Sequence, residues 1–263
     1  MRDAPSLHWP EYLIEAAGLG LFMAAAGGFA VLLFHPASAV PPAVGDPLLR
    51  RSLMGLAMGL TAVGLIYSPW GQRSGAHFNP AVTLTFFRLG KIAGPDALGY
   101  AAAQAAGGVV GLVLVWAATR GLVADPSVRW VVTVPGARGA GVAFVAEAAM
   151  SFLLMTVVLA ASNTPRLARR TGLFAGVLVA AYITVEAPLS GMSLNPARTF
   201  ASALPASVWT AFWVYLAAPP LGMLLAAELY ARLARGPVRC AKLHHDNPRR
   251  CIFRCGYRPR GAP

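Results

Sequence analysis

The sequence predicts an all-α membrane protein with six transmembrane helices and two re-entrant half-helices, arranged as an inverted repeat. Three observations predict this fold. The chain of 263 residues is 57% hydrophobic and 12% charged, whereas a soluble domain has about 25% charged residues. Several long stretches carry no Asp, Glu, Lys or Arg, and one short pattern occurs twice. This composition also excludes a disordered chain, and three cysteines are too few for a disulfide-built scaffold.

The uncharged stretches predict the membrane spans, because a helix that crosses a bilayer needs about 20 mostly apolar residues. Trimmed at turn signals, the six spans are residues 11–34, 48–68, 95–119, 141–161, 171–187 and 206–233. None has the polar face of a surface helix in a soluble protein. The first stretch is longer than the core of a cleavable signal peptide, so we interpret it as a span, and the lipid bilayer is a predicted partner.

The basic residues predict the orientation of the chain. Six spans place both termini on one side, and 16 of the 22 Lys and Arg residues fall on that side, nine of them from Arg232 onward. The positive-inside rule therefore predicts cytoplasmic termini, and we expect a bacterial inner (plasma) membrane. Arg50 and Arg51 lie on the opposite side and go against the trend locally.

The chain contains an internal repeat. The sequence SGAHFNPA at 74–81 returns as SGMSLNPA at 190–197, and Glu15 and Glu147 are each followed by two alanines. The two halves, about 11–120 and 141–233, hold three spans each. Because three is an odd number, the second half must insert upside down, and inverted repeats of this kind place a shared site near the midplane.

Each repeated motif reads as the start of a helix, since asparagine is a strong N-cap and proline suits the first helical position. The motifs are Asn79-Pro80-Ala81 and Asn195-Pro196-Ala197, and the helices predicted after them are 81–90 and 197–204. Each would be roughly 15 Å long, half of the ~30 Å hydrocarbon core. Non-helical backbone at that depth needs protein or a water-filled cavity beside it. The pattern therefore predicts a pore.

With SGAHFNPAVT at 74–83, SGMSLNPART at 190–199, Glu15 and Glu147, the chain resembles the major intrinsic protein family of aquaporins and aquaglyceroporins over residues 11–233. The resemblance implies a passive channel for water or small neutral solutes that excludes protons and ions. It also implies a homotetramer with one pore per subunit. Residues 1–234 would form the channel domain and 235–263 a basic cytoplasmic tail.

Charged and polar residues near the motifs are candidate pore residues. Arg198 lies three residues after Asn195, and an arginine inside the membrane is expected to face water or carbonyl groups. There it would repel cations, while the two motif asparagines orient water. Glu15 and Glu147 are read as buried anchors for loop backbone rather than as a proton relay. His77 is expected to line the pore or to anchor its loop.

The predicted selectivity filter departs from the family patterns. Counting back twelve residues from Asn195 gives Ile183 where water channels resemble one another in a histidine, and the loop position is Met192. The second-span position is Gly59 or its neighbour Met58. With Arg198, this filter is apolar apart from one charge. Thr199 stands where glycerol facilitators typically have aspartate. We therefore expect water conduction, with passage of small uncharged solutes such as glycerol, urea or metalloid hydroxides.

The tail carries all three cysteines, as Cys240-x3-His244-His245-x5-Cys251-x3-Cys255. Cys240, His244, Cys251 and Cys255 are a candidate tetrahedral zinc site, and no other cofactor is expected. The alternatives are a solvated tail with incidental thiols, or basic residues that bind anionic headgroups.

Other classes of protein fit less well. The spans contain no catalytic constellation, so no enzyme is expected, and the positive charge is sorted by membrane side rather than gathered in a nucleic-acid-binding patch. A secondary transporter shares the inverted repeat and remains the alternative. It usually needs intramembrane ionisable residues for coupling, and only Glu15, Glu147 and Arg198 qualify.

Overall fold

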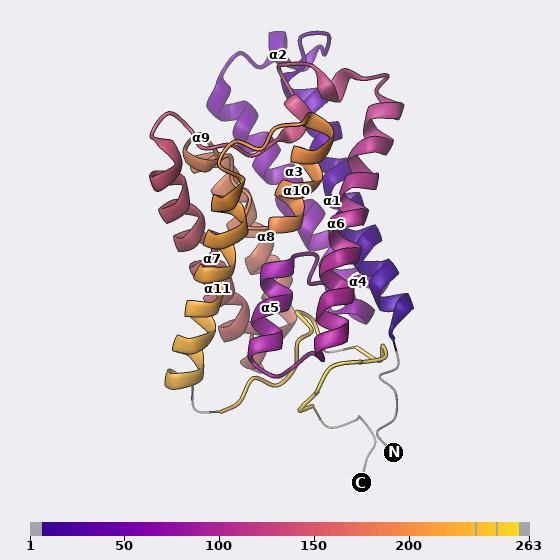
Figure 1. The fold of residues 1–263 in the computed structure, drawn as a ribbon, viewed down its shortest axis with the longest axis vertical. Helices are drawn as coiled ribbons and strands as arrows, with labels where there is room; N and C mark the ends of the chain where they lie inside the picture. The colour runs from indigo at the N-terminus through magenta and orange to yellow at the C-terminus, as the bar shows by residue number, and fades with distance from the viewer. Residues whose placement is uncertain (1–6, 235, 246, 258–263) are drawn as a thin grey trace.

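Six long helices surround two short ones (Figure 1). The structure is a computed structural model that describes residues 7–234, 236–245 and 247–257. All six long helices are long and apolar enough to cross a membrane. They are α1 (Trp9–Phe34), α3 (Pro47–Tyr67), α6 (Gly94–Ala118), α7 (Gly139–Asn163), α8 (Thr171–Val185) and α11 (Phe212–Leu233). The predicted all-α fold with six spans is confirmed.

The two short central helices are α5 (Pro80–Arg88) and α10 (Pro196–Ala206). In each, the motif asparagine is the N-cap: Asn79 Oδ1 accepts from Ala81 N at 2.8 Å, and Asn195 Oδ1 accepts from Ala197 N at 3.0 Å. Proline follows at the first helical position, where its missing N–H costs nothing. In Figure 1, α10 lies above α5 within the ring of long helices. They extend in opposite directions from the centre, as the inverted repeat predicts.

A short helix precedes each motif, α4 (Pro69–Ser74) in the first half and α9 (Ala187–Ser190) in the second. The remaining short elements are α2 (Val40–Ala43) and three 3-10 turns at Leu122–Ala124, Arg129–Val131 and Ala168–Arg170. A glycine in the left-handed region ends each of the two short helices, Gly75 with φ 96° and Gly191 with φ 79°. The turn from short helix into motif is thus built the same way twice.

The long helices pair through small residues. A Cβ atom on Gly111 of α6 would lie 2.1 Å from the carbonyl oxygen of Gly20 on α1. In the second half, a Cβ on Gly222 of α11 would lie 2.1 Å from the carbonyl oxygen of Ala148 on α7. Because membrane helices associate by close packing rather than by expelling water, these glycines set the spacing of the helical ring.

The predicted sixth span, 206–233, was wrong at its start. Helix α10 continues to Ala206, and α11 begins only at Phe212. Between them Ser207 and Ala211 take left-handed backbone, with φ of 53° and 48°. These residues reverse the chain direction, so one apolar stretch contains the end of the half-helix, a turn and the last span. The fifth span also ends two residues early, at Val185, where α9 follows.

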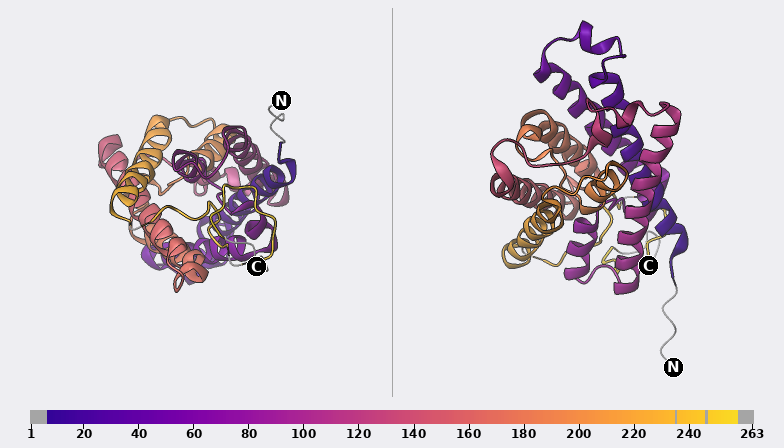
Figure 2. Two further views of the ribbon diagram at one scale, coloured as in Figure 1. Left: turned by 90° about the horizontal axis from the view of Figure 1, so that it is seen from below. Right: turned by 45° about the horizontal axis from the view of Figure 1, so that its top comes forward.

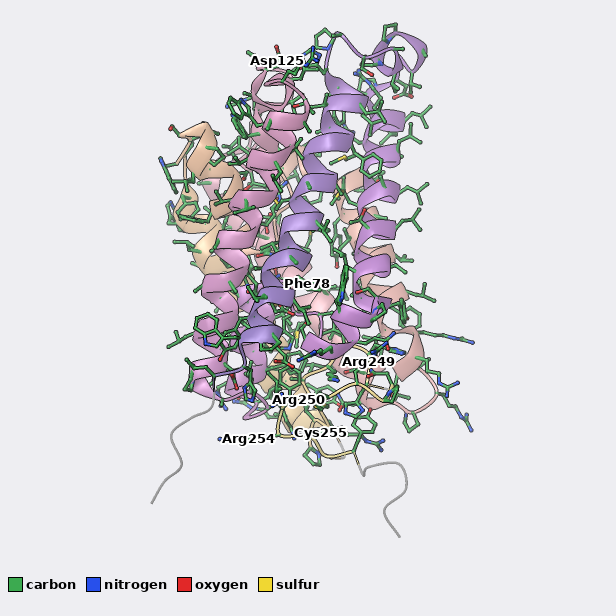
Figure 3. All side chains as sticks on the ribbon, turned by 90° about the vertical axis from the view of Figure 1, so that its right-hand side faces the viewer. Phe78, Asp125, Arg249, Arg250, Arg254 and Cys255 are labelled. Atoms are coloured by element: carbon green, nitrogen blue, oxygen red, sulfur yellow. The ribbon has the colours of Figure 1, made fainter. Side chains whose placement is uncertain are left out.

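The start of α1 and the described part of the tail lie at the same end of the molecule, which we call the terminal face (Figure 1). The tail crosses this face beneath the helical ring (Figure 2). Arg249, Arg250, Arg254 and Cys255 lie there, whereas Asp125 lies at the opposite end (Figure 3). Several tail residues are buried, namely Val238, Cys240, Ala241, Lys242, Leu243 and Phe253. The alternative of a solvated tail does not fit this packing. The predictions for residues 1–6, 235, 246 and 258–263 lie outside the described residues.

Candidate functional site

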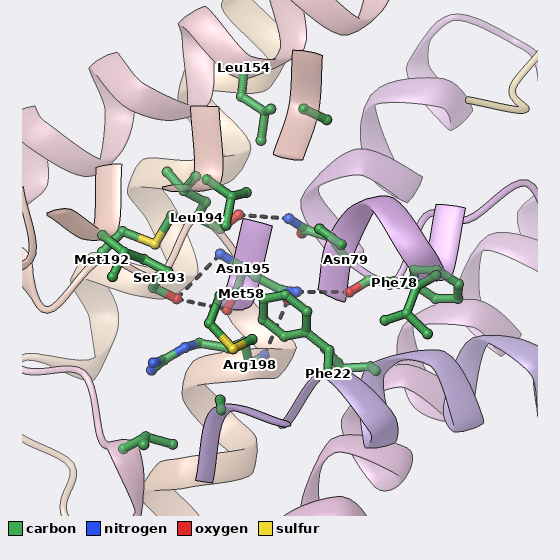
Figure 4. Close-up of a pocket in the computed structure, with 18 of the residues that line it drawn as sticks. Phe22, Met58, Phe78, Asn79, Leu154, Met192, Ser193, Leu194, Asn195 and Arg198 are labelled. Atoms are coloured by element: carbon green, nitrogen blue, oxygen red, sulfur yellow. Dashed lines mark hydrogen bonds between the residues drawn. The ribbon is translucent and has the colours of Figure 1, made fainter. Parts of the chain in front are cut away.

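A cavity of about 560 Å³ lies between the two halves of the chain (Figure 4). Its wall is mostly apolar, with a few polar groups from the two motifs. Leu243 of the tail lines it on the terminal side, and Arg51 lines it on the other. The sequence-predicted residues that line it are His77, Asn79, Ile183, Met192, Asn195 and Arg198. The fold thus brings together residues that are more than a hundred positions apart in sequence.

The two motif asparagines bind the two loops to each other. Asn79 Nδ2 donates to Leu194 O at 2.7 Å, and Asn195 Nδ2 donates to Phe78 O at 2.8 Å. Figure 4 shows both bonds at the cavity wall. An amide NH₂ has two hydrogens, so each asparagine keeps one donor beyond this exchange. Both side chains line the cavity, where that donor can meet a passing molecule.

Glu15 and Glu147 hold the loops that carry the motifs. Glu15 accepts hydrogen bonds from Ser74 Oγ at 2.6 Å, His77 N at 3.2 Å and Phe78 N at 2.6 Å. Both carboxylates are fully buried. Glu15 and Glu147 therefore accept hydrogen bonds from the loop backbone, and neither side chain lines the cavity.

The second half repeats this arrangement. Glu147 accepts from Ser190 Oγ at 2.6 Å, Ser193 N at 2.7 Å and Leu194 N at 2.7 Å. The bonds offset backbone strain, since a non-glycine residue in the left-handed region costs of order 1–3 kcal/mol. Four loop residues have positive φ at equivalent positions of the two halves, namely Ala76, Phe78, Met192 and Leu194.

Arg198 enters the cavity from α10, one turn after the N-cap. Its backbone N–H donates to Asn195 Oδ1 at 3.2 Å. Its Nη1 is buried and has no hydrogen-bond partner among the described residues. An unpaired guanidinium donor in an apolar wall is costly, so this nitrogen needs an acceptor that the described residues do not supply.

The other filter candidates line the same cavity as Arg198, with one correction. Ile183, Met192 and Met58 line the cavity. Gly59 faces α8 instead, where a Cβ on it would lie 2.6 Å from Gly176 O. Placing Gly59 in the filter was therefore wrong, because α3 packs against α8 at this position too closely for a side chain. The preceding residue, Met58, lines the cavity instead.

His77 lines the cavity and also contacts the tail. Its Nδ1 lies 3.0 Å from Thr83 Oγ1, and its Nε2 lies 2.9 Å from the carbonyl oxygen of Ala241. The ring stacks between Phe86 and Phe253, at centroid distances of 5.1 and 5.4 Å. The tail contact cannot be inferred from sequence, because nothing in the spacing relates residue 77 to residues 241 and 253.

The tail gathers four groups that could hold a metal ion: Cys240, His245, Cys251 and Cys255. The structure places His245 in this group, in place of the predicted ligand His244. His244 packs its ring edge against Tyr67 at 5.0 Å, whereas His245 Nε2 lies 2.9 Å from Cys255 Sγ. The hydrogen bond with Cys240 lowers the pKa of the Cys251 thiol well below its ordinary value.

Three supporting residues escaped the list of sequence candidates. Tyr100 and Tyr215 donate their hydroxyls to Ser74 O and Ser190 O, at 2.6 and 2.5 Å. The two tyrosines occupy equivalent positions of the internal repeat, and this repetition could have identified them from the sequence. Gln104 Nε2 donates to Glu15 Oε2 at 2.7 Å, but proline stands at the equivalent position 219, so the repeat gives no hint of it.

The fold and the cavity define an integral multi-pass membrane protein of the channel class. Residues 6–230 match the family described as "Major intrinsic protein". The chain belongs to this family and is a passive channel for water and small neutral solutes. The comparisons give no support to the alternative of a secondary transporter.

Individual relatives agree with the family match. The chain is 37% identical over 220 residues to "Glycerol uptake facilitator protein-like 6" of Lactiplantibacillus plantarum, covering 82% of this chain and 94% of the relative. It is 35% identical over 189 residues to "Probable aquaporin AqpM" of Archaeoglobus fulgidus, covering 69% and 76%. The fold is similar to that of the aquaglyceroporin from Plasmodium falciparum, with a TM-score of 0.74, 21% identity, and coverage of 86% and 97%.

Proposed function

We propose that the cavity conducts water, together with small uncharged solutes such as glycerol, urea or metalloid hydroxides, and excludes protons and ions. The observation that carries this proposal is the exchange of amide hydrogen bonds between Asn79 and Asn195 at the cavity wall. It supports a polar centre with one further amide donor from each asparagine, within a wall that is mostly apolar.

The proposed proton barrier is electrostatic. Each half-helix carries roughly +0.5 charge at its N-terminus, and α5 and α10 both begin at the cavity. A water molecule at the asparagines would point its oxygen toward their donors and its hydrogens away on both sides. A proton wire cannot continue through such a water. Arg198 adds a full positive charge on the α10 side.

The proposed filter consists of Met58, Ile183, Met192 and Arg198. Three apolar side chains and one cation offer few hydrogen-bonding groups, so a solute with carbon atoms finds apolar contacts that a strictly polar filter lacks. The similarity to a relative named as a glycerol uptake facilitator supports glycerol as a solute to test. Which solutes pass besides water is part of the proposal.

Further parts of the proposal concern organisation. We assign residues 1–234 to the channel domain and 235–263 to a basic cytoplasmic tail, with both termini in the cytoplasm of a bacterium and the channel in its inner membrane. The excess of Lys and Arg on the terminal side supports this orientation. A homotetramer with one pore per subunit is proposed on family membership.

Proteoliposome swelling tests the proposal. Purified protein in liposomes is mixed with a hypertonic glycerol or urea solution in a stopped-flow instrument, and light scattering follows shrinkage and re-swelling. Water and solute permeability above those of empty liposomes are expected, without a change in internal pH. Permeability no higher than in empty liposomes would refute conduction, and saturable uptake driven by an ion gradient would favour a transporter.

A further inference from the structure

Four tail residues have the geometry of a zinc site. The ligand atoms of Cys240, His245, Cys251 and Cys255 all lie within 4.8 Å of one another. The sulfurs of Cys240 and Cys251 are 3.5 Å apart, and Cys255 Sγ is 2.9 Å from His245 Nε2. A tetrahedral zinc ion with three thiolates and one imidazole needs about 3.8 Å between sulfurs and about 3.6 Å between sulfur and nitrogen. The cluster therefore needs only small movements to accept the ion.

The charge beside the cluster also fits a bound metal. Three thiolates and one Zn²⁺ carry a net charge of −1. Lys242 lies between the first two ligands of the cluster in the sequence. It is 2% exposed and donates to Arg249 O at 3.2 Å and Arg250 O at 2.6 Å.

Lys242 has no ion pair with a carboxylate in the described part of the chain. Glu11, which lies at the same end of the chain's fold as the tail, is already paired with Arg73 at 3.0 Å. A buried cation without a counter-charge is costly, and a zinc–thiolate group would supply that counter-charge.

The segment between the first two ligands lies against the terminal side of the cavity. Leu243 lines the cavity and is buried, and its N–H donates to Gly75 O at 3.1 Å. Ala241 O accepts from His77, and Phe253 stacks on the same ring. The metal ligands at 240 and 245 therefore lie on either side of Ala241 and Leu243, the tail residues that contact His77 and line the cavity.

We propose that Cys240, His245, Cys251 and Cys255 bind one zinc ion, and that this ion holds residues 241–244 across the terminal mouth of the pore. The gating part rests on the proposed function, whereas the metal site does not. The alternative chemistry for the cluster is a Cys240–Cys251 disulfide, which would leave Cys255 and His245 without a shared role.

Metal analysis of the full-length protein in detergent tests the site. After zinc loading and removal of free metal, about one zinc per chain is expected, and cobalt substitution should give the visible bands of tetrahedral Co²⁺–thiolate. Cys251→Ser and His245→Ala should each weaken binding at least about tenfold. The matched control is His244→Ala, which should retain the metal. Size-exclusion chromatography shows that each variant is folded.

Three results would overturn the site: less than about one zinc per ten chains in the wild type, metal loss in His244→Ala with retention in His245→Ala, or two thiols missing from a thiol count under denaturing, non-reducing conditions. The third result would indicate the disulfide.

Swelling assays test the gate. Removing zinc from wild-type proteoliposomes with a membrane-permeant chelator should raise water permeability several-fold. Cys251→Ser should start at the higher value and not respond to the chelator. Equal permeability with and without zinc in the wild type would overturn the gate. If every variant matches empty liposomes, channel function and gate both fail, while zinc content still decides the metal site.

Discussion

Glu15 and Glu147 occupy equivalent positions in the two halves, yet Glu15 has one more hydrogen-bond partner. Gln104 donates to Glu15, whereas Pro219 stands at the equivalent position of the second half. Glu147 instead interacts electrostatically with the positive charge of Arg198. The loop of the first half is thus held by an extra neutral donor, and that of the second half lies in the field of the pore cation.

Removing the second anchor should destabilise the protein. Glu147→Ala leaves the N–H groups of Ser193 and Leu194 without their acceptor, at about 1–3 kcal/mol for each unsatisfied group, whereas Ser190 Oγ can still donate to Glu186 Oε2 at 3.0 Å. We expect a loss of at least about 2 kcal/mol and a clearly lower thermal unfolding temperature in detergent. The control is Glu228→Ala, whose exposed pair with Arg88 should contribute about 0–1 kcal/mol. Equal unfolding temperatures for the two variants would contradict the anchoring role.

Removing the pore cation should admit protons. A unit charge about 4 Å away contributes about 4 kcal/mol at an effective dielectric constant of about 20. Arg198→Ala should therefore raise proton influx at least about tenfold, read from a pH-sensitive dye inside proteoliposomes. Arg138→Ala, an exposed residue outside the cavity, is the control and should remain proton-tight. A proton-tight Arg198→Ala channel that still conducts water would assign the barrier to the asparagines and helix ends alone.

Narrowing the filter should separate water from larger solutes. Ile183→Phe places a bulkier ring in the cavity wall, so glycerol should be excluded more strongly than water. The ratio of glycerol to water permeability is expected to fall at least about tenfold. Ile183→Leu conserves volume and should keep the ratio of the wild type. A ratio unchanged in Ile183→Phe would show that the narrowest part lies elsewhere.

The contact between α3 and α8 should not tolerate a side chain. A Cβ on Gly176 would lie 2.7 Å from Gly59 O and 2.4 Å from Val63 Cγ2. Gly176→Ala should therefore destabilise the protein by about 1–3 kcal/mol. The matched control, Gly64→Ala on α3, places its Cβ in open space and should be neutral or stabilising. Thermal unfolding of both variants checks this, and equal destabilisation would refute the packing argument.

The fold could be predicted because hydrophobic length and the inverted repeat are properties of the sequence itself. The repeat predicted the two motifs and their glutamates, and the family resemblance added the cavity residues Ile183, Met192 and Arg198. The choice between Met58 and Gly59 depends on helix rotation, where one residue turns a side chain by about 100°. His244 and His245 are adjacent, so spacing alone cannot choose between them. Gln104 has no repeat partner and therefore gave no signal.

The exchange of hydrogen bonds between the two asparagine loops has a consequence for how the chain inserts into the membrane during synthesis. Until residue 194 has left the ribosome and entered the bilayer, Asn79 has no carbonyl to bind, and Phe78 O has no donor. The first three spans alone would therefore leave polar groups exposed in lipid, which is costly. A nascent chain halted near residue 120 should hold its first half-helix outside the membrane, and the pore forms only as the last spans are inserted.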